Sequence, residues 1–329
     1  MIRFAAALAL IVGAAAVIFV IYERAGSNRP VFGLPVDCKI GARCYIQSHV
    51  DRDPGPGAAD YTCGSLSYDG HKGTDFRVAT FADMKEGVDV LAVAHGTVRA
   101  VRDGVGDTGA GDFPVGQECG NAVALTHDDG WETQYCHLAR DTVSVRPGDA
   151  VRAGDRLGRI GFSGNTEFPH LHLSVRKDGE PMDPFGAQSM TDDCTEPEAN
   201  TLWSPEALAE LAYRPGGVVD LGIMDAPPKL SAIREGGHAV LPQASSTTLI
   251  MWARFFGVRA GDLLTIRLTG PEGDIVESET RMDRNRAEEM RYAGKKSGAG
   301  WLKGVYTAIA TIHRADKIYD RRRQNFTLN

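Results

Sequence analysis

The stretch Phe168–Arg176, FPHLHLSVR, alternates apolar and polar residues and places two histidines one residue apart. Successive side chains of a β-strand point to opposite faces, so this alternation predicts a strand. The expected polar face carries His170, His172, Ser174 and Arg176, and the expected core face carries Leu171, Leu173 and Val175. Two imidazoles on one open strand face can reach a single ion or substrate, although an ordinary polar face explains an isolated pair equally well.

Two further segments contain residues that could join this pair. YDGHKGTDF holds His71 and Asp75, which share one face of an extended chain, and Gly73 between them permits close backbone approach. TQYCHL places Tyr135 and His137 on one expected strand face, with the intervening cysteine on the other. Histidine and aspartate are suitable zinc ligands. Each segment alone is a weak indication, and a polar surface explains it more simply.

The whole chain has the pattern of an all-β protein with two domains. Short β-branched segments separated by Gly, Pro and Asp clusters fill residues 28–195, and helical periodicity is nearly absent there. Residues 196–224 predict a linker with a short helix, in which Ser204 caps the start and Pro205 takes the first helical position. Residues 225–329 predict an antiparallel β-sandwich of immunoglobulin-like type.

The N-terminal segment, residues 1–27, predicts export. From Phe4 to Tyr22 it has no charged residue, and that length suits a bilayer span. We favour an uncleaved transmembrane helix over a cleaved signal peptide, because no small-residue cleavage site follows closely. The net charge of −7 and the lack of a recurring basic cluster argue against a nucleic-acid partner.

Six cysteines fit an oxidising compartment. They form no CxxC pair, which disfavours a four-cysteine zinc site and favours disulfides. Sequence alone permits about 15 pairings. Short loop closure favours Cys38–Cys44, and neighbouring strands favour Cys119–Cys136. Elimination then leaves Cys63 with Cys194.

Taken together, the three segments resemble a known family. The order His71-x-Gly73-x-Asp75, Tyr135-x-His137-Leu138 and His170-x-His172 is similar to that of the M23 zinc metallopeptidases of the lysostaphin/LytM type. The resemblance covers about residues 60–184 and extends to GNAVALTHDDG and VRPGDAVRAGDRLGRIGFSGNT. Phe168 departs from the pattern, because relatives often have a small residue before the Pro-His pair.

The resemblance implies a fold and a set of site residues. It implies a LytM-type antiparallel peptidase domain in which Zn²⁺ is held by His71, Asp75 and His172. Three protein ligands leave a fourth position for water, as in catalytic zinc sites. His137 and His170 would be the catalytic pair, one as the base and one at the oxyanion. Further candidates for substrate or oxyanion contact are Tyr68, Asn121 and Tyr135.

The implied function is zinc-dependent hydrolysis of peptide cross-links in peptidoglycan. We expect this activity in the cell envelope, on the periplasmic side of the cytoplasmic membrane, with a D-alanyl–diaminopimelate bond favoured over a glycine bridge. The alternative is a catalytically silent LytM-type wall-binding regulator of amidases. The second domain has no catalytic cluster, so a binding or spacer role, with a possible protein partner, is its default interpretation.

Overall fold

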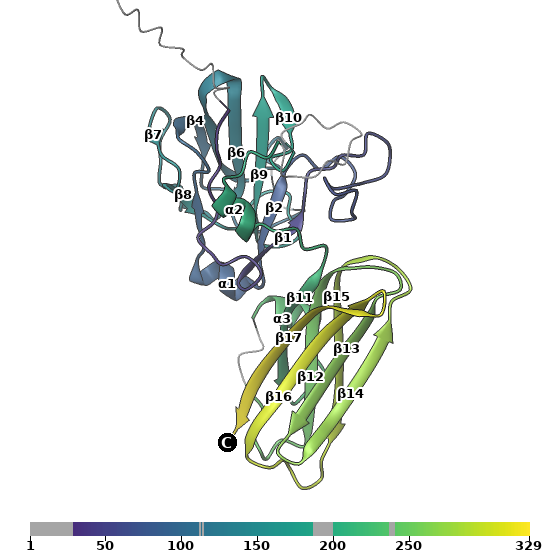
Figure 1. Cartoon of the computed structure of the whole chain (residues 1–329). Coiled ribbons are helices and arrows are strands. Elements are labelled where there is room, and N and C mark those ends of the chain that lie inside the picture. The colour runs from purple at the N-terminus through teal and green to yellow at the C-terminus, as the bar shows by residue number, and fades with distance from the viewer. Residues whose placement is uncertain (1–28, 112, 114, 187–199, 237–240) are drawn as a thin grey trace, which may run out of the picture.

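The computed structural model describes residues 29–111, 113, 115–186, 200–236 and 241–329. They form two β-rich domains that lie one beyond the other along the chain (Figure 1). The only helices in these residues are short: α1 (Phe81–Glu86), the 3₁₀ turn η1 (Asp128–Gly130), α2 (Pro205–Glu210) and α3 (Leu230–Arg234). The all-β fold class is confirmed.

The first domain is built on one large antiparallel sheet. Its strand order is β1-β2-β9-β6-β5-β4-β7, with β10 paired to β9, and β3 and β8 form a separate pair. The strands are β1 (Cys44–Ser48), β2 (Thr74–Val78), β3 (Asp89–Leu91), β4 (Gly96–Arg102), β5 (Asn121–Thr126), β6 (Trp131–Leu138), β7 (Ala150–Val151), β8 (Arg156–Arg159), β9 (His170–Lys177) and β10 (Glu180–Met182). The three strands that carry the predicted site, β2, β9 and β6, are therefore neighbours.

The predicted FPHLHLSVR strand is present as β9, at the centre of this sheet. Leu171, Leu173 and Val175 are at most 1% exposed and belong to the core of the domain. Burial of three aliphatic side chains on one face fixes the register of β9, because a slip by one residue would expose this face and bury the face that carries the histidines. The hydrophobic face thus determines where both histidines point.

Local sequence signals explain the short helices. At α1, Thr80 accepts a hydrogen bond from the Asp83 N–H while the Asp83 side chain accepts one from the Thr80 N–H, a reciprocal capping box. At α2, Ser204 is the N-cap and Pro205 opens the helix, as predicted.

The second domain is a sandwich of two antiparallel sheets, β11-β12-β15 and β14-β13-β16-β17. Its strands are β11 (Gly217–Met224), β12 (Thr248–Val258), β13 (Leu263–Gly270), β14 (Gly273–Arg281), β15 (Arg286–Lys296), β16 (Gly304–Arg314) and β17 (Lys317–Leu328). Residues such as Met251 and Phe255 from one sheet and Ile266 and Ile312 from the other share one buried cluster. The predicted two-layer sandwich is therefore observed.

One boundary in the predicted domain scheme needs correction. The stretch assigned to the linker, residues 196–224, ends in strand β11, which pairs along β12 from Gly217 to Met224. Its apolar residues Val218, Leu221 and Ile223 are buried in the sandwich core. The Pro-rich segments on both sides suggested a linker, but the burial of this strand makes it part of the second domain.

Two of the predicted disulfides, Cys38–Cys44 and Cys119–Cys136, are present. The third prediction, Cys63–Cys194, involves Cys194, which lies outside the described residues. The predicted membrane anchor at residues 1–27 also lies outside them. Within the described part of the chain, no helix is long and apolar enough to span a bilayer.

Candidate metal and catalytic site

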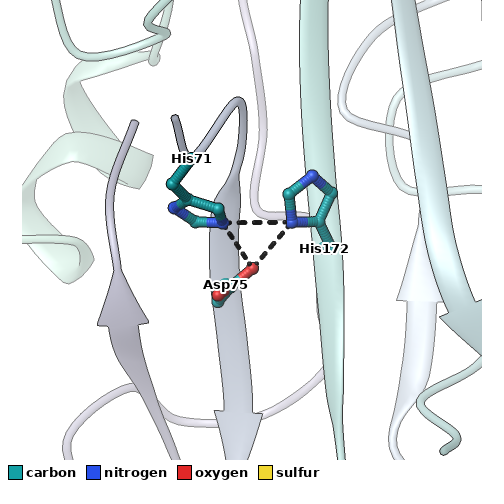
Figure 2. A group of neighbouring side chains, drawn as sticks. All are labelled: His71, Asp75 and His172. Carbon is teal, nitrogen blue, oxygen red and sulfur yellow. Dashed lines mark hydrogen bonds and ion pairs between the residues drawn. The ribbon is translucent and has the colours of Figure 1, made fainter. Parts of the chain in front are cut away.

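Three predicted ligands converge at one point of the first domain. Figure 2 shows His71 from the segment before β2, Asp75 from β2 and His172 from β9 pointing toward one another. Nε2 of His71 lies 3.2 Å from Oδ1 of Asp75 and 3.2 Å from Nδ1 of His172. Nδ1 of His172 lies 2.8 Å from the same Asp75 oxygen. One donor atom of each residue thus falls within 4.8 Å of the others.

Strand register and a glycine produce this convergence. Asp75 and His172 are directly opposed in the β2–β9 pair, so their side chains share one face. Gly73 lies beside the His172 ring: a Cβ at residue 73 would be 2.5 Å from Nε2 of His172. Only glycine at residue 73 leaves room for the His172 ring. The close backbone approach predicted for this glycine is therefore observed.

The two ligand histidines are oriented by hydrogen bonds from their other ring nitrogens. Nδ1 of His71 donates to the backbone carbonyl of His49 at 2.6 Å, and Nε2 of His172 lies 3.0 Å from Oγ of Ser174. Such outer contacts fix the tautomer of a metal-binding imidazole and leave the opposite nitrogen free as the ligand.

His170 and His137 lie beside the ligand cluster. Nε2 of His170 is 3.4 Å from Oδ1 of Asp75, and the ring centroids of His170 and His137 are 4.7 Å apart. Each ring is held at Nδ1 by a backbone carbonyl, Phe168 O at 2.9 Å for His170 and Ser163 O at 2.8 Å for His137. Both therefore keep Nε2 available for proton transfer or hydrogen bonding.

A backbone irregularity orients His137. Its φ of 62° lies in the left-handed region, and the β5–β6 register shifts between Asn121 and Val123. This is the geometry of a β-bulge, which re-aims a side chain and occurs often beside active sites. The expectation that Tyr135 and His137 share a strand face is wrong for this reason, because simple alternation ends at the bulge.

The electrostatics of the cluster favour an anionic Asp75 and neutral rings at His137 and His172, whereas the Asp75 carboxylate overcomes the effect of burial and raises the pKa of His71. Burial alone would raise the pKa of Asp75, but the nearby His71 and His170, with hydrogen bonds from His170 and His172, hold it well below its usual range. Burial lowers the pKa of His137 to about 3, helped by the neighbouring imidazoles. Burial also lowers the pKa of His172. A carboxylate with neutral imidazoles is the protonation state that a metal ion requires.

This donor set fits zinc. Two imidazoles and one carboxylate belong to the ligand types of catalytic zinc sites, and three protein ligands are the usual number there. All three donor residues are buried or nearly so, and their donor atoms are close enough for one ion to bridge them. His137 and His170 stand next to the set and are free for chemistry.

The structure corrects two of the three further candidates. Tyr135 is fully buried in the core, where its hydroxyl accepts a hydrogen bond from the Val93 N–H at 2.9 Å. Asn121 is also fully buried, and its amide donates to the carbonyls of Val105 and Leu138 at 2.8 and 3.0 Å. Neither can contact a substrate; Asn121 instead secures the backbone next to His137.

Tyr68 is placed differently. Its ring stacks on that of His71 with centroids 4.3 Å apart, and its side chain is largely open to solvent. Partial desolvation on the side that faces the site, with the Asp75 charge, raises the pKa of Tyr68 above its usual value, so the phenol stays protonated. Tyr68 is thus a hydrogen-bond donor at the edge of the site.

Sequence reasoning did not identify the groups that orient the histidines. His49 supplies the carbonyl that holds His71, and Ser163 supplies the one that holds His137. Oγ1 of Thr166 lies 3.1 Å from Nδ1 of His170. Ser163 and Thr166 both belong to the GFSGNT segment, which was noted only as part of the family resemblance.

Comparison with known proteins agrees with this geometry. The model of peptidase family M23 matches residues 69–184, which include all five site residues, four histidines and one aspartate. Those residues are a peptidase family M23 domain. The match begins just before His71 and ends just after Asp183, so this M23 domain lies within the first domain of the structure and does not include the sandwich.

Several curated proteins are similar to this M23 domain. The DD-carboxypeptidase/endopeptidase Mpg of Neisseria meningitidis is 34% identical over 117 residues, covering 34% of this chain and 25% of that protein. Peptidoglycan DD-endopeptidase ShyB of Vibrio cholerae is 29% identical over 117 residues, covering 36% and 23%. Cell division protein DipM of Caulobacter vibrioides is 32% identical over 117 residues, covering 34% and 18%. The chain thus spans a quarter or less of the length of these relatives.

Among solved structures, a zinc-containing peptidase from Vibrio cholerae is similar at 26% identity and a TM-score of 0.33, over 47% of this chain and 39% of that one. The catalytic domain of lysostaphin from Staphylococcus simulans is similar at 25% identity and a TM-score of 0.26, over 37% and 82%.

Proposed function

We propose that this protein is a zinc-dependent endopeptidase that hydrolyses peptide cross-links of peptidoglycan. The observation that carries the proposal is the joint placement of two groups of residues. His71, Asp75 and His172 form a three-ligand set, and His137 and His170 lie against it with Nε2 available. A structural metal site needs no such additional imidazoles.

When bound, zinc supplies Lewis-acid chemistry: it acidifies water and polarises the scissile carbonyl. The protein's own contribution comes from the two remaining histidines. One imidazole accepts the proton of the attacking water and delivers it to the leaving amine. The other, with Tyr68 at the edge of the site, hydrogen-bonds the oxyanion that develops on the carbonyl. Backbone carbonyls at Nδ1 keep both rings aimed during these steps.

The substrate assignment is supported by the relatives of the M23 domain, which include DD-endopeptidases of peptidoglycan. We propose the same class of bond, a D-alanyl–diaminopimelate cross-link. The two disulfides of the first domain support an oxidising compartment, and we propose the periplasmic side of the cell envelope, with residues 1–27 as the anchor.

The second candidate is a catalytically silent regulator that binds cell wall and activates amidases. Such a protein would not need a complete ligand set or the catalytic pair. The presence of all five residues in one cluster favours the enzyme.

Digestion of purified peptidoglycan, with and without a zinc chelator, tests the proposal. We expect cross-linked muropeptide dimers to disappear, the chelator to stop this loss, and mass analysis of the products to identify the bond. One equivalent of bound zinc with no cleavage of any wall type would favour the regulator instead.

A further inference from the structure

The two domains are joined by a buried cluster of ionic groups. Glu288 of β15 lies at its centre, 3.3 Å from the Arg77 guanidinium and 3.1 Å from that of Arg254. The side chains of Glu288 and Arg77 are 7% and 3% exposed, and that of Arg254 is fully buried. Arg254 also donates to the backbone carbonyl of Ala79 at 2.8 Å. Charged groups this deeply buried are costly unless paired, so their position calls for a reason.

Arg77 connects this cluster to the site. It lies on β2 two residues after the ligand Asp75, and in the β2–β9 register it stands opposite His170. Gln47 of β1 accepts a hydrogen bond from its guanidinium at 3.0 Å, while Glu288 holds it from the second domain. The Arg77 side chain is therefore fixed at two points, by Gln47 of the first domain and by Glu288 of the second.

Phe168 fills the space between Arg77 and His170. The guanidinium of Arg77 lies over the Phe168 ring, 4.4 Å from its centroid, at the distance of a cation–π contact. The Phe168 ring in turn lies 4.6 Å from the His170 ring, and the carbonyl of Phe168 accepts the His170 Nδ1 hydrogen bond. Both the ring and the backbone of Phe168 thus support His170, at the position where the sequence departs from the family pattern.

We propose that Arg77 is a positioning residue for His170, held in place by Glu288 of the second domain and acting through Phe168. The contacts run in one continuous series, from Glu288 through Arg77 and the Phe168 ring to the His170 imidazole. The role of the second domain in this arrangement is to fix a catalytic side chain of the first. The kinetic part of this inference rests on the proposed function.

The expected consequence is specific. Arg77 contacts none of the three metal ligands in the described hydrogen bonds and ion pairs, so its removal leaves the metal bound. Loss of the cation–π contact frees the Phe168 ring and lets the His170 ring reorient. A misplacement on the order of 1 Å in a catalytic group can cost up to about 100-fold in rate. We expect kcat to fall about ten-fold, with KM unchanged.

The test compares Arg77→Met with Arg314→Met in the full-length protein. Arg314 is a matched control, because it also pairs with a carboxylate, Asp262 at 2.8 Å, and also lies over an aromatic ring, Tyr319 at 4.4 Å. Both of these partners, Asp262 and Tyr319, are in the second domain. We expect the loss in kcat only in Arg77→Met, with equal bound zinc in both variants.

A readout independent of activity comes from ¹H–¹⁵N spectra of the histidine rings. His170 signals should shift or broaden in Arg77→Met and stay unchanged in Arg314→Met. If the wild-type protein fails to cleave peptidoglycan, the proposed function fails, and these spectra alone decide the positioning role. Unchanged His170 signals in Arg77→Met would overturn it.

Phe168→Leu provides a second route should Arg77→Met not fold. It removes the ring contact but keeps the backbone carbonyl, and it should produce the same change in His170 and the same fall in kcat. Where both variants fold, combining them should add little, because the two residues act in series. Fully additive losses, or a Phe168→Leu protein with wild-type His170 signals and kcat, would contradict the proposal.

Discussion

The two domains are both antiparallel β structures, yet their interiors differ in chemistry. Of the 22 buried polar or charged residues in the described part of the chain, 19 belong to the first domain. The second domain has three: Arg254, Asp262 and Thr311. Burying polar groups costs free energy unless each is hydrogen-bonded. The first domain, which contains the site, buries many such groups. The sandwich has an ordinary apolar core and supports the first domain.

The two domains also differ in where non-glycine residues adopt a positive φ. In the second domain, the non-glycine residues with positive φ in the described segments are Ala315 and Asp316, which form the turn between β16 and β17. In the first domain, His137 has a positive φ inside a strand. Such strain at a non-turn position persists only where surrounding contacts impose it, and it occurs often at functional sites.

Removal of histidines from the site of the first domain should have the largest effects on metal binding and activity. His172→Ala should abolish metal binding and activity, because it removes a ligand. His170→Ala should retain the metal but lose about 10²- to 10⁴-fold in kcat, the usual contribution of a proton-transfer group. Metal content by atomic emission and turnover on peptidoglycan check both results.

The matched control is His313→Ala, a half-buried histidine on β16 of the second domain. It should change neither metal content nor turnover. The reverse pattern, with metal lost from His170→Ala and kept by His172→Ala, would exchange the two assignments.

Gly73→Ala tests the space around the ligand histidine. The new Cβ would lie 2.5 Å from Nε2 of His172 and 2.9 Å from the Leu173 carbonyl, so the ring must move away from its Ser174 contact. Loss of such a supporting contact weakens metal affinity about 10- to 100-fold. Competition with a chelator measures the affinity. Gly298→Ala is the control, because nothing lies within 4 Å of its added Cβ, and an equal affinity loss there would argue against the steric explanation.

Arg254→Met tests the link between the domains. It leaves Asp220 without its two contacts to Arg254 and removes the bond to Ala79, so we expect a loss of about 3 kcal/mol in the free energy of unfolding. Chemical denaturation measures this loss. Arg267→Met removes an exposed pair with Asp274 in the same domain and should leave the free energy of unfolding almost unchanged. Similar losses in both variants would mean that burial of the cluster contributes little.

The smallest effect should appear as a pH dependence of stability. Arg77, Arg234 and Arg254 outweigh the effect of burial and lower the pKa of Glu288 to about 2, from a usual value of 4.5. A carboxylate with a lowered folded-state pKa contributes stability above the unfolded-state pKa, and this contribution disappears as pH falls from 4.5 to about 2. The unfolding temperature of Glu288→Gln should therefore depend less steeply on pH in this range than that of the wild type. Identical acid profiles would exclude Glu288 as the responsible group.

Much of the fold could be predicted from local pattern. Alternation located β9, and the capping residues located α2. Short loop closure predicted the disulfide Cys38–Cys44, and the expectation of neighbouring strands predicted Cys119–Cys136. Strand β11 was missed because the Pro-Gly segments beside it suggested a linker, and only its pairing with β12 made it a strand. A strand whose stability comes from a partner far along the chain has little local signal.

The sequence by itself determined the types of residue available for chemistry and the alternation that puts His170 and His172 on one strand face. Tertiary structure decided which of these groups meet. The bulge at His137 placed its ring on a different strand face from Tyr135. Packing buried Tyr135 and Asn121, which therefore support the site from within the domain. The second domain placed Glu288 against Arg77, more than 200 positions away in the chain. Periodicity acts over a few residues, whereas side-chain orientation at a site depends on contacts between segments that only the folded chain brings together.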